Sequence, residues 1–241
     1  MTHRVSHAVL AILGLALSGC VTNDPAALAA HDPFEPTNRF FFDATQKADR
    51  AILKPIAKGY VAVVPKPLRD GLHNVLTNID QPVVFGNEIL QGSPKSAGAT
   101  LGRFVVNSTV GVGGAIDIAT KIGIPSDDQD AGITLGKWGL SEGPYVFVPL
   151  VGPAPPRDAL GRGIDYFMQP LDDVRFPGSK TLNYSRIGLG VLDERAENLD
   201  TLDQIQRTSI DFYATTRSLY RQSRDAKING GKPNTQNLPN F

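Results

Sequence analysis

Apolar residues recur every three or four positions along several stretches of this chain, which is the period of an amphipathic helix. The stretch after Pro67 is the clearest, because Leu68, Leu72, Val75 and Ile79 fall on one face of a helix. Similar spacing predicts further helices over residues 38–53, 94–106, 156–167, 179 onward and 199–227. We therefore expect a mainly α-helical protein with few strands.

Capping residues and prolines predict where these helices begin and end. Thr37 can cap the first helix, Pro55 is expected to end it, and residues 59–67 then form a connector. Pro82 is expected to break or kink the helix that begins near Pro67. Residues 132–153 are apolar and rich in glycine, which predicts a short strand or an ordered loop.

Residues 104–125 form an unusual stretch, FVVNSTVGVGGAIDIATKIGIP, in which Asp117 and Lys121 are the only charges. The apolar run before Asp117 is too short to cross a bilayer and long for a surface loop. Two interpretations stay open, a buried hairpin or a hairpin that dips into a bilayer and returns.

The first twenty residues have the pattern of an export signal. Arg4 gives a positive start, an apolar run extends from Ala8 to Leu17, and the sequence LSGC ends at Cys20. This ending resembles the lipobox of bacterial lipoproteins, in which the chain is cut before the cysteine and acylated there. Because each buried CH₂ contributes about 0.8 kcal/mol, such an anchor is stable. Val21 replaces the aspartate that retains lipoproteins in the inner membrane, so we expect the outer membrane.

These observations predict four parts of the chain. They are a signal peptide (1–19), an acylated tether (20–36), a single helical domain (37–228) and a polar C-terminal tail (229–241).

Composition excludes several classes of protein. Lys and Arg number 24, as do Asp and Glu, so the chain lacks the positive field expected of a nucleic-acid binder. Charged residues make up 20% and hydrophobic residues 41%, which excludes an intrinsically disordered chain. The single cysteine excludes an intramolecular disulfide.

One enzyme motif occurs, because residues 139–143 (GLSEG) fit the G-x-S-x-G pattern of lipases around Ser141. That motif needs a strand before the serine, a helix after it and a downstream histidine, whereas no histidine follows His73. We expect a glycine-rich turn and no enzyme. The scattered histidines, and an acidic run at 127–130 that lacks the glycine and glutamate of a calcium loop, predict no metal site.

Taken together, stretches along nearly the whole mature chain resemble the VacJ/MlaA family of outer-membrane lipoproteins. The stretches are DPFEPTNR (32–39), VPKPLRDGLHN (64–74), Pro82 with Asn87 and LQG (90–92), RFVVNSTVGVGGAIDIA (103–119), GITLGKWGLSEGPYVFVPLVGP (132–153) and DERAENLD (193–200). Their order, following a lipobox, makes the resemblance specific.

This resemblance implies a ring of amphipathic helices in the inner side of the outer membrane around a polar channel. Such proteins remove mislocalised phospholipids from the outer leaflet and hand them to a soluble periplasmic carrier. They associate with porin trimers and need no metal or cofactor. A solid helical core would use the same apolar stripes, and a structural lipoprotein that braces porins is the alternative function.

The resemblance also implies roles for particular residues. Gly111, Gly113 and Gly114 match a hairpin beside the pore that is thought to gate it, and Asp117 either faces the bore or caps the hairpin helix. Asn38 and Arg39 match the start of the first helix, and Phe41 lies at the lipid interface or in the core.

Overall fold

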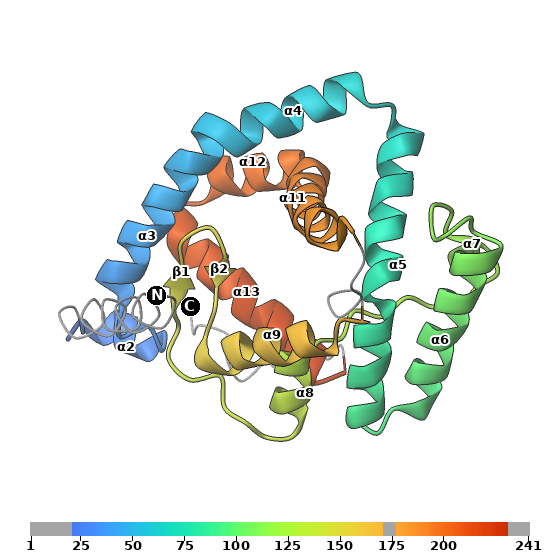
Figure 1. Ribbon diagram of the computed structural model, residues 1–241. Helices are drawn as coiled ribbons and strands as arrows, with labels where there is room; N and C mark the ends of the chain where they lie inside the picture. The colour runs from blue at the N-terminus through green and yellow to red at the C-terminus, as the bar shows by residue number, and fades with distance from the viewer. Residues whose placement is uncertain (1–20, 171–176, 231–241) are drawn as a thin grey trace.

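The helices of this chain are arranged as a ring (Figure 1). A computed structural model describes residues 21–170 and 177–230. The predicted signal peptide, Cys20 and all but two residues of the predicted tail lie outside these described residues. Within the ring, one helix (α11) lies inside the outline formed by α3, α4, α5 and α9, where it contacts α4 and α5.

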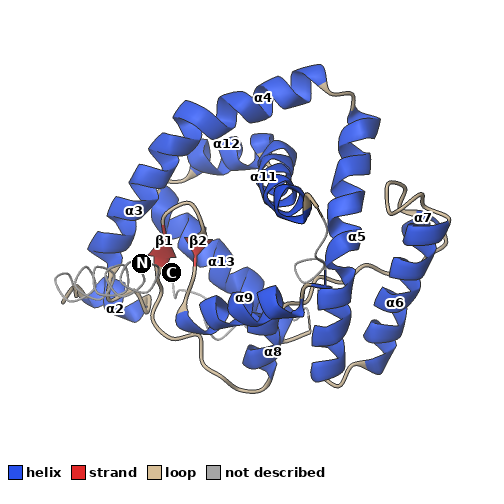
Figure 2. Cartoon of the chain, in the orientation of Figure 1, coloured by secondary structure: helices blue, strands red, loops and turns tan. Residues whose placement is uncertain are grey.

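Helices dominate the described residues, and a single pair of short antiparallel strands accompanies them (Figure 2). This confirms the predicted fold class. In chain order the elements are α2 (Pro25–Ala29), α3 (Glu35–Ala48), η1 (Asp49–Leu53), α4 (Lys54–Val63), α5 (Lys66–Leu90), α6 (Pro94–Thr109), α7 (Ile118–Lys121), α8 (Ala131–Lys137), β1 (Phe147–Val148), β2 (Gly152–Pro153), α9 (Pro156–Met168), α11 (Ser179–Glu197), α12 (Leu199–Thr208) and α13 (Phe212–Ile228).

Proline begins many of these helices. It occupies the first or second helical position of α2, α3, α4, α5, α6 and α9. A proline costs nothing there, because the N–H that it lacks would have no partner within the helix. The frequent prolines thus divide the chain into the segments from which the ring is built.

Pro55 does not end the first helix, contrary to the prediction. The chain passes from α3 through the π-helical turn η1 directly into α4, in which Pro55 occupies a first-turn position. The Lys54 N–H donates to the Asp49 carbonyl across this wider turn. The wider turn leaves room for the proline ring, which would clash with a carbonyl in a regular α-helix. The predicted connector is therefore partly helical, up to Val63.

Pro82 does not end its helix either, since α5 continues to Leu90. Its neighbours Gln81, Val83 and Val84 are buried. An interior proline costs about 3 kcal/mol, and we infer that packing of this face against neighbouring elements offsets that cost.

The predicted last helix is two helices, α12 and α13, separated at residues 209–211. The Asp211 side chain accepts a hydrogen bond from the Ala214 N–H and thereby caps α13. A capping aspartate with an extended backbone begins a new helix, so the apolar positions of the helix predicted over residues 199–227 are divided between two helices.

Residues 132–153 were predicted to form a strand or a loop, and they contain both a helix and strands. Asp130 caps the short helix α8 by accepting from the Ile133 N–H. The strands β1 and β2 then pair through Phe147 with Pro153 and Val148 with Gly152.

Much of the predicted tether is part of the folded ring. Residues 25–29 form helix α2, and Asp32 is completely buried. The Asp32 carboxylate accepts hydrogen bonds from Asn38 Nδ2 (2.7 Å), Tyr213 OH (2.5 Å) and Arg217 Nη1 (2.6 Å). These bonds join the N-terminal segment to α13 and so close the ring.

The interior of the described protein is unusually polar. Its one apolar cluster, where α3, β1 and α13 meet, consists of Phe42, Tyr145, Phe147 and Tyr213, with rings packed edge to face. Elsewhere, buried polar and charged residues are at least as numerous as buried apolar ones.

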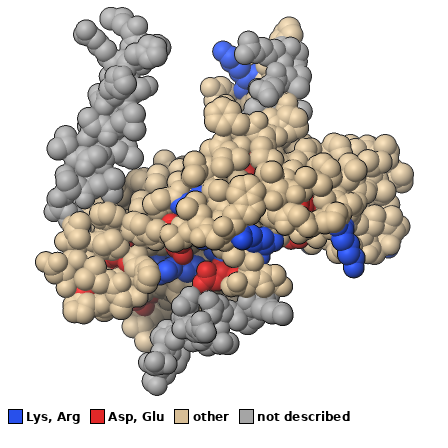
Figure 3. Space-filling model, turned by 90° about the horizontal axis from the view of Figure 1, so that it is seen from below, with Lys and Arg blue, Asp and Glu red and all other residues tan. Residues whose placement is uncertain are grey.

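Large apolar side chains lie on the outside instead. Examples are Ile56 and Val63 on α4, Leu101 and Val105 on α6, and Phe167 on α9. Figure 3 shows an edge of the molecule on which charged side chains gather along one side and leave most of the surface uncharged. Among the described residues, no helix has the length and apolar character needed to cross a bilayer.

Asp32→Ala is expected to lower the free energy of unfolding by about 3–5 kcal/mol, because Arg217 is left buried without its main partner. The melting temperature, followed by the circular dichroism of the helices, should fall by about 10 °C. Asp70→Ala, which removes an exposed pair with Lys66, is the control and should change little. Equal melting temperatures for the two variants would contradict the role of Asp32 in ring closure.

Candidate functional site

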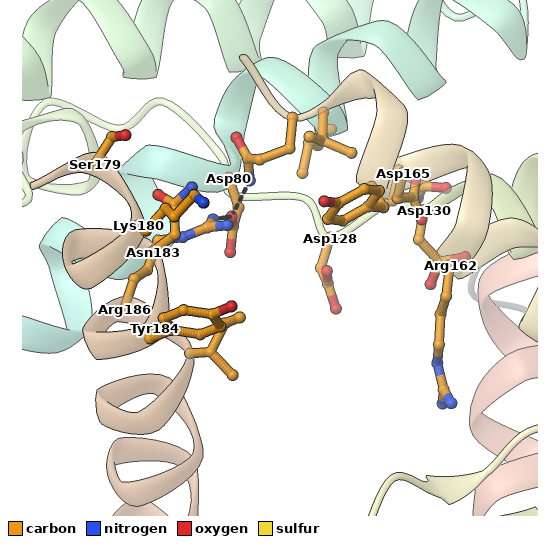
Figure 4. Close-up of a pocket in the computed structure, with 16 residues that line it drawn as sticks. Asp80, Asp128, Asp130, Arg162, Asp165, Ser179, Lys180, Asn183, Tyr184 and Arg186 are labelled. Atoms are coloured by element: carbon orange, nitrogen blue, oxygen red, sulfur yellow. Dashed lines mark hydrogen bonds and ion pairs between the residues drawn. The ribbon is translucent and has the colours of Figure 1, made fainter. Parts of the chain in front are cut away.

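A cavity of about 1040 Å³ lies inside the ring (Figure 4). This volume is at the upper end of the range of about 300–1,000 Å³ that holds small organic ligands. The cavity is partly open, and side chains from four places form its wall. They are Asp80 and nearby residues of α5, residues 128–130, residues of α9 from Arg162 to Tyr166 with Gln169 just after that helix, and residues of α11 from Ser179 to Ile187.

The α11 wall presents hydrogen-bond donors. Lys180, Asn183 and Arg186 lie at helical spacing along it, and Figure 4 shows them on the same side of the cavity. Arg186 pairs with Asp80 of α5 (Nη1 to Oδ1, 3.4 Å), and Gln169 Nε2 donates to the same carboxylate at 2.7 Å. Lys180 is exposed and forms no hydrogen bond or ion pair with any described residue. Its charge is therefore available to a ligand.

The opposite wall is acidic. Asp130 is held by Arg224 through two contacts of 2.5 and 2.9 Å. Burial opposes ionisation of Asp130, but the Arg224 guanidinium lowers its pKa below the ordinary value. Asp165 accepts bonds only from neutral groups, Asn87 Nδ2 (2.8 Å) and the Ala131 N–H (3.1 Å), and burial raises its pKa.

Close backbone packing fixes this acidic wall. At Gly161 of α9, a Cβ atom would lie 2.2 Å from the backbone nitrogen of Gly132 in α8. The two helices therefore pack directly against each other at these two glycines. Asp158 of α9, which is buried, accepts from Arg157 Nε (2.8 Å), Arg224 Nη2 (3.0 Å) and Tyr220 OH (2.5 Å). We infer that α8, α9 and α13 move as one unit.

The residues predicted from the sequence lie in two other places. Gly111, Gly113, Gly114 and Asp117 are brought together in the turn between α6 and α7, which makes the Gly-rich hairpin a helical one. Asn38, Arg39 and Phe41 lie on α3 near the ring closure. None of these seven residues lines the cavity, and control of passage by the hairpin stays a prediction.

Asp117 caps helix α7, one of the two roles considered for it. Its carboxylate accepts from the Thr120 N–H and hydroxyl, from Asn107 Nδ2 and from Arg103 Nη2. Burial alone would raise the pKa of Asp117, yet these bonds lower it to about 2. Asp117 thereby connects α7 to the buried Arg103 of α6.

The α3 residues stabilise the ring. Asn38 is buried, donates to the Tyr145 carbonyl (3.0 Å) and accepts from the Phe147 N–H (2.9 Å), which holds β1 against α3. Arg39 pairs with Asp211 (2.6 Å) and lies 4.6 Å from the centre of the Tyr213 ring. Phe41 is half-buried against the aromatic cluster, so it belongs to the core.

Ser141 does not lie in a nucleophile elbow. Helix α8 precedes it and strand β1 follows it, which is the reverse of the required order. His73 pairs with Asp193 (2.8 Å). The described residues contain no group of three His, Cys, Asp or Glu side chains that could hold a metal ion.

Sequence reasoning missed the cavity-lining residues. The polar residues Lys180, Asn183 and Arg186, three positions apart on this helix, were a usable signal. The signal was weak, because a solvated helix face has the same spacing.

The three hairpin glycines have different roles, and alanine substitutions should separate them. A Cβ at Gly111 would lie 2.3 Å from the Ile116 carbonyl oxygen, and one at Gly114 would lie 2.7 Å from the Asn78 side chain. Gly111→Ala and Gly114→Ala should therefore destabilise the protein by several kcal/mol. Gly113 has open space and a φ of +67°, so Gly113→Ala should cost only about 1 kcal/mol.

Thermal unfolding of the three variants measures this order. Transport should also be measured in the Gly113→Ala variant, because this variant is expected to fold. A change in its transport rate would then come from the altered backbone conformation of the hairpin and not from disturbed packing. A melting temperature for Gly113→Ala as low as that of Gly111→Ala would contradict this assignment.

Comparison with known proteins agrees with this architecture. The family model described as MlaA lipoprotein matches residues 30–227. The intermembrane phospholipid transport system lipoprotein MlaA of Haemophilus influenzae is 33% identical over 225 residues, covering 90% of this chain and 88% of that protein. Its Escherichia coli counterpart is 32% identical over 228 residues, covering 93% and 89%.

A solved structure described as a structural basis for maintenance of bacterial outer membrane lipid asymmetry has the same fold. It aligns with a TM-score of 0.73 at 30% identity and covers 82% of this chain and 98% of its own. From the family match, these relatives and the shared ring of helices, it follows that this chain belongs to the MlaA lipoprotein family.

Proposed function

We propose that this protein is the outer-membrane lipoprotein of an intermembrane phospholipid transport system. It takes phospholipids that have reached the outer leaflet, passes them through the cavity of the ring and delivers them to a soluble periplasmic carrier. The observation that carries this proposal is a charged cavity inside a ring whose outer surface is apolar. Family membership, and the phospholipid transport named for its relatives, support it.

The physical need of the transported molecule matches this arrangement. A phospholipid headgroup carries a phosphate, and moving an unpaired charge into hydrocarbon costs many kcal/mol. The donors on α11 offer a path on which the phosphate keeps charged or polar partners. Because the cavity is partly open, the acyl chains can remain in an apolar environment outside it while the headgroup moves.

The proposed position in the membrane follows from the same surface. The exposed apolar side chains on α4, α6 and α9 would contact acyl chains of the inner leaflet or the wall of a porin trimer. The acyl groups on Cys20 would hold the N-terminal end of the ring in that leaflet. The side of the ring with the charged residues would then face the periplasm and the carrier.

Deletion of the gene should raise the amount of phospholipid exposed on the cell surface, measured by labelling or by a surface-active phospholipase.

Plasmid-borne Lys180→Gln should restore asymmetry less well than wild type, with a rate of phospholipid removal lower by about fivefold, the factor that corresponds to about 1 kcal/mol. Lys66→Gln, which changes an exposed lysine outside the cavity, is the matched control and should restore asymmetry fully.

An unchanged surface after deletion, with defects of porin assembly, would instead support a lipoprotein that braces porins. Full restoration by Lys180→Gln would contradict the role of the cavity.

Cys20→Ala should release the protein from the membrane fraction, because the described helices offer no span that replaces the anchor. Fractionation followed by immunoblotting measures this, and Ser18→Ala, next to the anchor, serves as the control. Unchanged sedimentation of the Cys20→Ala variant would show that the apolar surface alone holds the ring in the membrane.

A further inference from the structure

The two walls of the cavity carry opposite charges. Figure 4 shows Lys180 and Arg186 of α11 on one side and Asp128, Asp130 and Asp165 on the other. A site for a simple anion needs no carboxylates, since they would repel the ligand. The acidic wall is therefore unexplained by phosphate recognition alone.

Contacts within the protein account for only part of these charges. Arg224 neutralises Asp130 in a two-point contact, and Arg186 pairs with Asp80. Among the described side chains that line the cavity, Lys180 and Arg162 have no carboxylate partner, Asp165 accepts no bond from a cation, and Asp128 pairs only with Lys227. Asp165 has only neutral partners, an amide and a backbone N–H.

Asp128 keeps its negative charge accessible. Its contact is with Lys227, and about 81% of its side chain is exposed, so solvent weakens this pair. Arg162 is the cation nearest in position along α9, but its Nη2 donates to the Pro153 carbonyl (2.7 Å) and its side chain extends away from the carboxylates. The acidic wall therefore presents negative charge to the cavity.

We propose that the cavity selects zwitterionic phospholipids that carry a primary ammonium, with the phosphate at Lys180 of α11 and the ammonium at Asp128 and Asp165. This inference rests on the proposed transport function and adds a substrate class to it. A zwitterionic headgroup has a partner of opposite sign on each wall, whereas an anionic glycerol headgroup would place hydroxyls against the carboxylates. The proposed selection acts on the headgroup alone, so the acyl chains can follow the same path for every phospholipid.

The test uses the full acylated protein reconstituted in vesicles of equimolar phosphatidylethanolamine and phosphatidylglycerol. The protein is extracted in mild detergent, and mass spectrometry measures the ratio of the two lipids that remain bound. Wild type should enrich phosphatidylethanolamine by about two- to fivefold over the input, the range that a partly solvated ion pair gives. Asp128→Asn and Asp165→Asn should each reduce this enrichment, and together they should abolish it.

Asp70→Asn is the matched control, because it removes one carboxylate from the outer surface of α5 and leaves the cavity unchanged. Lipids bound to the outer surface are the same in control and test variants, so a difference between them reports on the cavity. Asp128→Asn keeps the test decisive if Asp165→Asn disturbs the bond to Ala131, since Asp128 is exposed.

The outcomes separate this inference from the transport function. A wild-type ratio equal to the input, or one unchanged in the double variant, overturns the headgroup selection. If Lys180→Gln still lowers the total lipid bound in that case, the transport cavity stands without selection. If Lys180→Gln retains as much bound lipid as wild type, both the headgroup selection and the transport role of the cavity are overturned.

Discussion

A wall one or two helices thick has almost no interior, and this constraint shapes the whole ring. Apolar side chains cannot all be hidden, so many face outward, while the helices are joined by buried hydrogen bonds and ion pairs. Asp32 is the clearest case, since its carboxylate connects the N-terminal segment to α3 and α13. Because Asp32 is completely buried, such contacts tolerate little change, and they give the ring a specific closure rather than a collapsed core.

The same constraint supplies the cavity. The inner wall carries charged side chains beside apolar ones, and several of these charges are already paired by neighbours, such as Asp130 by Arg224. Those that remain, Lys180 on one wall and Asp165 on the other, are the groups that a charged headgroup would meet. Charged residues of the ring therefore fall into two groups. Those paired with an opposite charge stabilise the fold, and those without such a partner are available to a ligand.

The structural effect of each proline and glycine depends on the atoms around it. Pro55 was expected to end a helix, but a π-helical turn accommodates its ring, and Pro82 lies within a helix whose neighbouring side chains are buried. Gly113 and Gly114 share a positive φ, yet only Gly114 lies against another side chain. Residue type thus indicated where the backbone is unusual, while the packing around each residue determined the consequence.

The sequence by itself determined the helical class, the start of several helices at prolines and the family, because these depend on local spacing and short motifs. It could not separate α12 from α13, since the capping role of Asp211 competes with a continuous apolar stripe. Only the tertiary structure decided that many large apolar side chains face outward and that residues from α5, α9 and α11 share one cavity. The physical reason is that a periodic stripe is identical whether it meets a core or a lipid, and long-range contacts alone distinguish the two.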